Sequence, residues 1–462
     1  MKTYTVVSLF SGAGGLDLGF VQSGRYRMLF ANDVLSSALT TYAKNLDLKL
    51  ELCSSRRTEA RPGVALVCDV AEVDFAPLGD VDVIVGGPPC QDFSIVRGPS
   101  WDRRGIEVRR GRLYAHFVRA LATLRPKAFV FENVPGLIST NGGLAYKVIL
   151  DDFSNLKLRW EEVRKVAGAD GTGVKPEGYE IVFADVVDFA KLGVPQRRER
   201  LIIAGLRRDI VKNRDVWDIR AKFSRAVHGG GLLFFKYPLT AIEAFEGSTL
   251  ENLGDVYREV MREWEGVWKE VGTPRAYEWK EREWDRLTFD IVKDYLTVSG
   301  IRDASDFDEA MEQHKRVLTE LGYYGVPVSS LKLQDGTTEE PSEDPRVIER
   351  MRMIPPGENH EFVRGTKWEV EGRGISLVYR RLHPLKPSYT IVAYGGGGTH
   401  GYHYRRNRAT LTLRERARLQ TFPDTFLFYG KRSEIRAQIG EAVPPLAGKK
   451  IAQALAEVLD ML

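Results

Sequence analysis

The chain has 462 residues, of which 43% are hydrophobic, and a net charge of +4, as expected for a globular protein of roughly two or three domains. Its cysteines, Cys53, Cys68 and Cys90, show neither the spacing of metal ligands nor an even number, which argues against a zinc site and favours a reducing intracellular compartment. No run approaches the roughly 20 apolar residues that cross a bilayer, so we expect a cytoplasmic protein without a membrane segment.

The first half of the chain alternates short β-rich runs with amphipathic helical stretches. Buried strands that alternate with helices predict an α/β fold, with a mostly parallel sheet covered by helices on both faces. In such sheets ligands bind at the carboxyl ends of the strands. The expected strands cover residues 6–10, 27–31, 64–68, 81–85, 128–131, 180–183 and 201–205, and the expected helices cover 16–23, 35–45, 113–124 and 143–153.

Beyond residue 206 the pattern changes to charged helical stretches, an acidic loop over residues 334–345 and a basic, glycine-rich segment from residue 379. Trp264 and Trp268 recur at near-helical spacing, which indicates core positions rather than a ligand box. Arginines cluster in residues 97–112, 197–208 and 405–418. Such clusters suit phosphate or base-edge contacts, and solvated helix faces are the alternative.

The first expected strand runs into a glycine loop, Phe10 to Gly15, in which Gly12 and Gly14 allow a tight turn and leave space for a ligand. A dinucleotide fingerprint has a third glycine where this chain has Asp17, and a carboxylate there would repel a diphosphate. The loop therefore favours a nucleoside cofactor without phosphates over a dinucleotide, and S-adenosylmethionine is the common cofactor of that kind.

Acids end the next two expected strands. Asp33 lies about 20 residues beyond the glycines, where an acid usually accepts the ribose hydroxyls. Asp69 could accept the exocyclic amine of adenine. Either acid could instead cap the N-terminus of a helix, because aspartate is favoured there.

The fourth expected strand ends in the segment Gly86 to Cys90, in which two prolines precede the cysteine. Each proline fixes its own φ and holds the residue before it extended, so Cys90 leaves the sheet on a stiff arm. A free cysteine is usually an inert core residue, but this position beside polar Gln91 favours a nucleophile. The fifth expected strand ends in Glu132, where a carboxylate is costly unless it is paired or works as an acid.

These segments, in this order, resemble the DNA cytosine-5 methyltransferases. The resemblance implies a Rossmann-like S-adenosylmethionine-dependent methyltransferase sheet and a smaller mixed target-recognition domain, which would occupy the unmatched residues 209–379. In the last matching block Glu441 stands where the family usually has asparagine. The blocks are Phe10 to Gly15, Pro88 to Gln91, Glu132 to Val134, Gln196 to Arg200, Leu411 to Asp424 and Gly440 to Pro445.

The resemblance implies covalent catalysis on a cytosine that is flipped out of duplex DNA. The Cys90 thiolate would add to C6 and make C5 nucleophilic toward the methyl group of S-adenosylmethionine. Glu132 would hold a proton on N3. Arg200, with Arg198 in the same block, would contact the O2 side and collect developing negative charge.

The resemblance also implies which residues bind the ligands. The loop from Gln91 to Gly111 would close over the flipped base. The residues for the cofactor are Phe10, Gly12, Gly14, Asp33, Asp69, Pro88, Leu113, Ala442 and Val443. The residues for substrate or DNA are Gln91, Ser94, Arg97, Arg103, Asn133, Gln196, Arg364 and Lys367, with Arg405, Arg406 and Arg408 on phosphates.

We divide the chain into a catalytic domain over residues 1–207, a target-recognition domain and hinge over residues 208–434, and a C-terminal segment over residues 435–462 that returns to the catalytic domain. The expected partners are double-stranded DNA and a cognate restriction endonuclease that acts on the same site. We expect a monomer, located in the cytoplasm and associated with the nucleoid through DNA.

Three alternatives stay open at this point. A tRNA cytosine-5 methyltransferase uses the same scaffold, although the large variable region argues against it. A non-catalytic binding protein would have no need to keep Cys90, Glu132 and Arg200 together. A nicotinamide-dependent oxidoreductase is disfavoured by Asp17.

Overall fold

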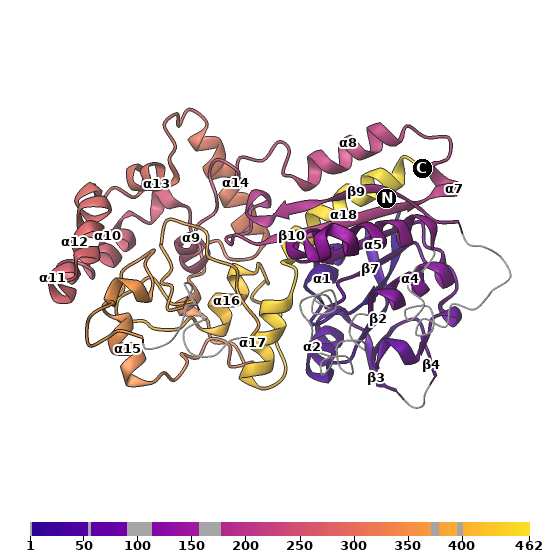
Figure 1. Cartoon of the computed structure of the whole chain (residues 1–462), viewed down its shortest axis with the longest axis horizontal. Helices are drawn as coiled ribbons and strands as arrows, with labels where there is room; N and C mark the ends of the chain where they lie inside the picture. The colour runs from indigo at the N-terminus through magenta and orange to yellow at the C-terminus, as the bar shows by residue number, and fades with distance from the viewer. Residues whose placement is uncertain (1, 54–56, 90–112, 157–176, 371–377, 395–400) are drawn as a thin grey trace. The chain divides into compact units, whose positions relative to one another are not determined.

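The computed structural model describes residues 2–53, 57–89, 113–156, 177–370, 378–394 and 401–462 (Figure 1). The chain forms two compact units. The first consists of Met1–Asp188, Glu199–Gly230 and Pro445–Leu462, and the second of Phe189–Arg198 and Gly231–Pro444. Each unit therefore combines segments that are far apart in the sequence.

An eight-stranded sheet in the order β3-β5-β2-β1-β7-β8-β10-β9 forms the framework of the first unit. Neighbours from β3 to β8 pair in parallel, whereas β10 pairs antiparallel with both β8 and β9. This arrangement confirms the predicted α/β fold with a mostly parallel sheet. The strands are β1 (Tyr4–Leu9), β2 (Tyr26–Asp33), β3 (Lys49–Leu52), β5 (Val64–Val67), β7 (Val83–Gly86), β8 (Ala128–Asn133), β9 (Tyr179–Asp188) and β10 (Glu199–Arg207), while β4 (Thr58–Glu59) and β6 (Val73–Asp74) pair separately.

Helices from both ends of the chain pack together in the first unit. The helix α1 approaches the C-terminal helix α18 so closely that a side-chain carbon on Gly19 would lie 2.3 Å from the Pro445 oxygen. A side-chain carbon on Gly448 would likewise lie 2.7 Å from the Leu16 oxygen, so glycine is needed on both helices. The helices of this unit are α1 (Gly15–Gln22), α2 (Ser36–Leu46), α4 (Leu113–Leu124), α5 (Leu144–Asn155), α7 (Arg208–Val211), α8 (Val216–Val227) and α18 (Pro445–Asp460).

An aromatic cluster anchors strand β8 in the core of the first unit. Phe129 and Phe131 of β8 pack against Phe117 of α4 and Phe153 of α5, and all four rings are fully buried. Several of these pairs meet edge to face, with ring centroids 5.2 to 6.0 Å apart. Because β8 is fixed in this way, the two residues that end it, Glu132 and Asn133, leave the core from a rigid base.

The described part of the second unit is mainly helical, with isolated β-bridges such as the one between Gln196 and Ser388. Trp264 and Trp268 are 0% and 6% exposed and pack with Trp279, which confirms that these tryptophans are core residues. None of the helices described in either unit is long and apolar enough to cross a membrane. The helices of the second unit are α9 (Ala241–Glu246), α10 (Gly254–Arg262), α11 (Val267–Val271), α12 (Pro274–Arg282), α13 (Ile291–Ser299), α14 (Phe307–Glu320), α15 (Pro345–Met351), α16 (Leu413–Leu419) and α17 (Arg432–Glu441).

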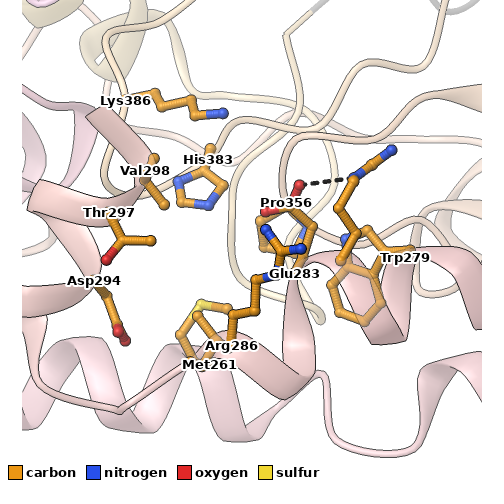
Figure 2. A pocket seen from close by; sticks show the side chains of 12 residues that line it. Met261, Trp279, Glu283, Arg286, Asp294, Thr297, Val298, Pro356, His383 and Lys386 are labelled. Atoms are coloured by element: carbon orange, nitrogen blue, oxygen red, sulfur yellow. Dashed lines mark hydrogen bonds and ion pairs between the residues drawn. The ribbon is translucent and has the colours of Figure 1, made fainter. Parts of the chain in front are cut away.

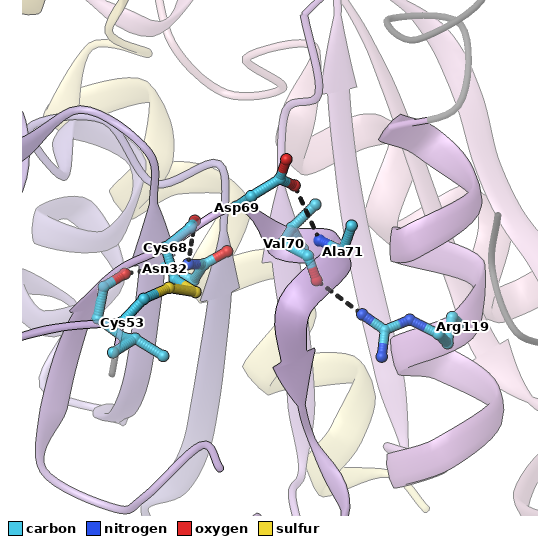
Figure 3. Close-up of a disulfide and its surroundings, with 8 residues drawn as sticks. Asn32, Cys53, Cys68, Asp69, Val70, Ala71 and Arg119 are labelled. Carbon is cyan, nitrogen blue, oxygen red and sulfur yellow. Dashed lines mark hydrogen bonds between the residues drawn. A yellow bond between two sulfur atoms is a disulfide. The ribbon is translucent and has the colours of Figure 1, made fainter. Parts of the chain in front are cut away.

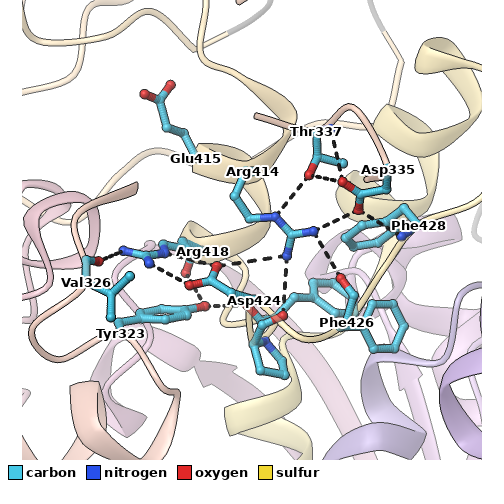
Figure 4. A network of polar contacts seen from close by, with 12 residues as sticks. Tyr323, Val326, Asp335, Thr337, Arg414, Glu415, Arg418, Asp424, Phe426 and Phe428 are labelled. Atoms are coloured by element: carbon cyan, nitrogen blue, oxygen red, sulfur yellow. Dashed lines mark hydrogen bonds and ion pairs between the residues drawn. The ribbon is translucent and has the colours of Figure 1, made fainter. Parts of the chain in front are cut away.

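Arg414 and Arg418 of α16 are buried and paired, so neither of the roles expected for this cluster applies to them (Figure 4). The guanidinium of Arg414 donates to Asp335 at 2.9 Å and to the Phe426 oxygen at 3.0 Å. That of Arg418 donates to Asp424 at 2.5 Å and to the Val326 oxygen at 2.8 Å. A buried charge is tolerated only when it is paired and hydrogen-bonded, so these contacts hold the second unit together rather than bind a partner.

Candidate active site

The glycine loop after β1 has the strained backbone that a close-fitting ligand site needs. Phe10, Gly12 and Gly14 all have positive φ, at 56°, 54° and 89°. A side-chain carbon on Gly14 would lie 2.6 Å from the Tyr42 ring, so this glycine is required by packing. At Gly12 such a carbon would meet nothing within 4 Å, so open space lies above the loop at that residue.

Asp33 ties the end of β2 to this loop. Its Oδ2 accepts a hydrogen bond from the Gly12 N–H at 2.8 Å, and its Oδ1 accepts one from the Leu35 N–H at 2.9 Å. Burial raises the pKa of the Asp33 carboxyl, while the main-chain donors lower it in part. The capping alternative does not apply to Asp33, because α2 begins at Ser36 and its N-cap residue is Leu35.

Asp69 caps the short 3-10 turn Val70–Glu72, so the capping alternative is confirmed for this residue. Its Oδ1 accepts a hydrogen bond from the Ala71 N–H at 3.0 Å (Figure 3). The Asp69 side chain is exposed at the end of β5. Asn32, which sequence reasoning missed, donates to the Leu66 and Cys68 oxygens and so joins the ends of β2 and β5. The signal for it was an amide side chain directly before Asp33.

Cys53 and Cys68 form a disulfide beside Asp69 (Figure 3). The expectation that the cysteines form no disulfide framework is therefore wrong. The physical reason is that β3 and β5 are parallel neighbours in register, with Leu52 opposite Val67, which places the next residues 5.2 Å apart between Cα atoms. The Glu72 carboxylate lies within 4.8 Å of both sulfur atoms. The disulfide removes the thiolates that a metal ion would need there.

Asp17 does not face the ligand space, which corrects the expectation that its carboxylate repels a diphosphate. Asp17 is 1% exposed in α1. Burial raises the pKa of its carboxyl to about 7, and hydrogen bonds with Ser8 and Tyr42 oppose part of that rise. A glycine loop binds a diphosphate through its main-chain N–H groups, and the Gly12 N–H already donates to a carboxylate.

The arm that leads to Cys90 is held by the end of β8. A side-chain carbon on Gly87 would lie 2.6 Å from Glu132 Oε2, so only glycine lets the carboxylate approach the arm. Asn133 Nδ2 donates to the Pro88 oxygen at 3.0 Å, and Asn133 is 3% exposed. Pro88 is also buried. Cys90 itself, and the predicted Gln91, Ser94, Arg97 and Arg103, lie outside the described residues.

Arg200 forms an ion pair with Glu132. Ile202 of β10 lies opposite Glu132 in the antiparallel register, and Arg200, two residues earlier, projects from the same face. Its Nε lies 3.0 Å from Glu132 Oε1, and the two side chains are 15% and 13% exposed. The carboxylate at the end of β8 is therefore paired, and the pair leaves part of each side chain open to a ligand.

Arg198 has contacts of a different kind, which indicate a structural role in place of the predicted base contact. It is 1% exposed, and its guanidinium donates to the Ile391 oxygen at 3.2 Å and to the Gly440 oxygen at 2.9 Å. These acceptors are main-chain groups of the second unit. Gln196 is also fully buried, and its amide bonds to Gln420 at 2.9 Å and to the Ile391 N–H at 2.8 Å, so its predicted DNA contact is corrected in the same way.

The three arginines expected on phosphates form ion pairs inside the second unit. Arg405 pairs with Glu259 and Glu263, both at 2.7 Å. Arg406 pairs with Glu270 at 2.5 Å, and Arg408 pairs with Glu340 and Glu415 at 3.1 and 3.0 Å. Their role on phosphates stays a prediction. The sequence hides the pairing because the acids of α10 and α11 lie far from residues 405–408 along the chain.

The structure gives the positions of the remaining predicted residues, and these positions do not test the predicted binding roles. Arg364 and Lys367 are exposed in the second unit, and Lys367 lies 3.6 Å from Glu349. Leu113 begins α4 and is half-buried. Ala442 follows α17 and accepts a hydrogen bond from Gln420 at 3.3 Å, while Val443 is buried. Their binding roles stay predictions.

Comparisons with known proteins agree on one family. The model for C-5 cytosine-specific DNA methylases matches residues 4–457. The chain is 67% identical over 467 residues to the DNA (cytosine-5-)-methyltransferase M.ApeKI of Aeropyrum pernix, covering all of both chains, and 31% identical to the type II methyltransferase M.NgoFVII of Neisseria gonorrhoeae, covering 98% and 87% of the two chains. A solved structure from Escherichia coli, described as a DNA modification methyltransferase encoded within a prophage, matches with a TM-score of 0.52 at 20% identity, covering 99% of this chain and 100% of that one, which supports the fold alone. The chain belongs to the C-5 cytosine-specific DNA methylase family.

Proposed function

We propose that this DNA (cytosine-5-)-methyltransferase uses Cys90 as its nucleophile and S-adenosylmethionine as its methyl donor, on a cytosine flipped out of duplex DNA. One observation carries the proposal. The end of β8 places Glu132, paired with Arg200, directly against Gly87 of the arm that leads to Cys90. The carboxylate and the arginine therefore lie beside the backbone that precedes Cys90 in the sequence.

Each group has a defined part in this proposal. The Cys90 thiolate forms a bond to C6, and the electron pair of the C5–C6 double bond moves so that C5 becomes nucleophilic. Glu132 holds a proton at N3 of the cytosine. This proton neutralises the negative charge that would otherwise build up on the ring. Arg200 donates to the O2 side. Once C5 carries the methyl group, a base or a water molecule takes up its proton, the C5–H electron pair restores the C5–C6 double bond, and Cys90 leaves C6 as the thiolate.

The residues around the glycine loop fit S-adenosylmethionine, which supplies an electrophilic methyl group when bound. Gly12 leaves open space beside Asp33, so a ligand can lie against the main chain at the carboxyl end of β1. Asp33 would accept the ribose hydroxyls, and Asp69 the exocyclic amine of adenine. Phe10, Gly14, Pro88, Leu113, Ala442 and Val443 complete the proposed set. Two carboxylates suit a cationic nucleoside.

The second unit supplies DNA recognition in this proposal. Exposed Arg364 and Lys367 are the candidates for base or phosphate contacts, with Arg405, Arg406 and Arg408 on phosphates. The relatives named as type II methyltransferases support a cognate restriction endonuclease with the same specificity as a partner. We propose a monomer that works on DNA in the cytoplasm. The tRNA alternative is not favoured by relatives that are named as DNA-modifying enzymes.

The experiment that tests the proposal is transfer of labelled methyl groups to duplex DNA and to tRNA side by side. The wild-type enzyme should label DNA, and the label should lie on C5 of cytosine. The Cys90→Ser variant should lose transfer while it still binds S-adenosylmethionine in equilibrium dialysis. Label in tRNA alone, or full activity of the variant, would contradict the proposal.

A further inference from the structure

A cavity of about 300 Å³ lies within the second unit, and none of its lining residues has a role in the reaction proposed above (Figure 2). Its walls come from α10, α12, α13, the turn Trp284–Arg286 and two loops that carry Pro356, His383 and Lys386. Part of the wall is apolar, with Met261 and Trp279 buried and Leu287 and Val298 half-buried. The rest is charged, which is the mixture typical of a site for a polar ligand with an apolar part.

The carboxylates of this pocket are already satisfied. Asp294 Oδ1 accepts hydrogen bonds from the N–H and hydroxyl of Thr288, at 2.9 and 2.8 Å. Its Oδ2 accepts from the Phe289 N–H at 3.1 Å and the Tyr257 hydroxyl at 2.9 Å. Glu283 pairs with Arg282 at 3.1 Å. The acids therefore offer little to a further ligand, and Arg282 is neutralised with them.

The cations Arg286 and Lys386 remain available. Both are exposed, and within the part of the chain that the structure describes no ion pair occupies either of them. An arginine and a lysine that line one pocket without acidic partners favour an anion. The excess of positive charge in this pocket is therefore open to a ligand.

His383 adds a neutral donor to the same wall. Its Nδ1 accepts a hydrogen bond from the Leu385 N–H at 3.1 Å, so the ring proton lies on Nε2. Burial and the neighbouring Lys386 lower the pKa of His383 to about 3, and the ring is neutral at physiological pH. The turn is fixed, because the Lys386 N–H donates to the His383 oxygen at 3.2 Å and the Ala241 N–H of α9 donates to the Lys386 oxygen at 3.1 Å.

We propose that this pocket binds one sugar-phosphate unit of the DNA backbone, with Arg286 and Lys386 on the phosphate and the apolar wall on the deoxyribose. The inference rests on the proposed function, since it requires duplex DNA as the substrate. An inorganic phosphate would leave the half-buried side chains of Leu287 and Val298 in the apolar wall uncovered. A contact to the backbone positions the duplex without reading its sequence.

The test is the salt dependence of DNA binding by the double variant Arg286→Gln with Lys386→Gln. The probes are a duplex that carries the sequence methylated by the wild-type enzyme and a duplex of the same composition without it. The slope of log affinity against log salt should become less steep by about 0.9, the value for one phosphate contact, and the loss should be equal on both duplexes. The double variant Arg302→Gln with Lys332→Gln removes the same charge at exposed sites outside the pocket and is the matched control.

Three results would overturn the proposal. An unchanged slope would show that the pocket holds no backbone phosphate. A loss of affinity only for the duplex that carries the recognition sequence would assign the pocket to base recognition. The third result combines two measurements: the slope is unchanged, and inorganic phosphate at constant ionic strength raises the melting temperature of the wild type but not of the double variant. That result would assign the pocket to free phosphate. Methyl transfer by the wild-type enzyme is measured on the same duplexes, so a failure of the proposed function is seen separately.

Discussion

The side-chain amide of Asn133 donates a hydrogen bond to the main-chain oxygen of Pro88 at 3.0 Å, and its own oxygen accepts from the Val134 N–H at 2.9 Å. Asn133 is buried, and its bond to Pro88 is made away from water. They join the end of β8 to the arm that precedes Cys90. Asn133 was predicted to contact the substrate; from its buried bond to Pro88 we infer a positioning role beside the proposed nucleophile.

The Asn133→Ala variant should lower kcat more than it changes the KM for S-adenosylmethionine. The truncation leaves the Pro88 oxygen and the Val134 N–H without these partners, at about 1–3 kcal/mol for each buried group. A displaced arm should reduce kcat by about 100-fold. The measurement is steady-state kinetics together with the alkylation rate of Cys90 by iodoacetamide. Asn133→Asp, which keeps the acceptor and loses the donor, should show most of the loss; a normal kcat in that variant would contradict the role.

The pair of Glu132 and Arg200 should behave as one unit in catalysis. Glu132→Gln removes the group proposed to hold the N3 proton, so kcat should fall by about 10² to 10⁴. Arg200→Ala should cost about 10²-fold. The double variant should lose much less than the product of these factors, because each residue depends on the other. Arg57→Ala breaks a pair with Asp74 in which the arginine is 81% exposed, and it should leave kcat unchanged. Additive losses at Glu132 and Arg200 would show independent roles.

Gly12 and Gly63 separate backbone strain from cofactor binding. Both have positive φ, at 54° and 81°, and an added side-chain carbon meets nothing within 4 Å at either site. Alanine at each should therefore cost about 1–2 kcal/mol of stability from backbone strain alone. Only Gly12→Ala should also weaken S-adenosylmethionine binding, by at least about tenfold, because it fills the space beside Asp33. Equilibrium dialysis and urea unfolding of both variants make the comparison, and equal affinities would remove the cofactor from this loop.

Local signals predicted the framework of the first unit well. The apolar runs that became β1, β2, β5, β7 and β8 are buried on both faces, so their composition alone marks them as strands of a parallel sheet. The strand β3 was missed because Lys49 and Glu51 alternate with leucines in a mostly exposed segment. The disulfide was missed because it depends on the register between β5 and the unpredicted strand β3.

Contacts between distant segments decided the site residues that sequence reasoning assigned wrongly. Arg198 and Arg200 are two residues apart in one block, yet Arg198 donates to main-chain oxygens around residues 391 and 440, whereas Arg200 reaches Glu132. Sequence reasoning also did not predict that Arg405 pairs with Glu259 and Glu263, because these acids lie far from it along the chain. A motif indicates which residue types a reaction needs. It does not indicate which of two like residues is exposed.

Asp17 should make the stability of the enzyme depend on pH. Because burial raises its pKa from 3.8 to about 7, the folded protein binds the proton more tightly than the unfolded chain. The stability contributed by the protonated carboxyl is complete below about pH 4 and is lost as the pH rises through about 7, by up to about 4 kcal/mol. Asp17→Asn has no such loss, so the stability of the variant relative to the wild type should increase between pH 5 and pH 8. Urea unfolding at both pH values measures the difference, and a difference that stays constant with pH would show that Asp17 has an ordinary pKa.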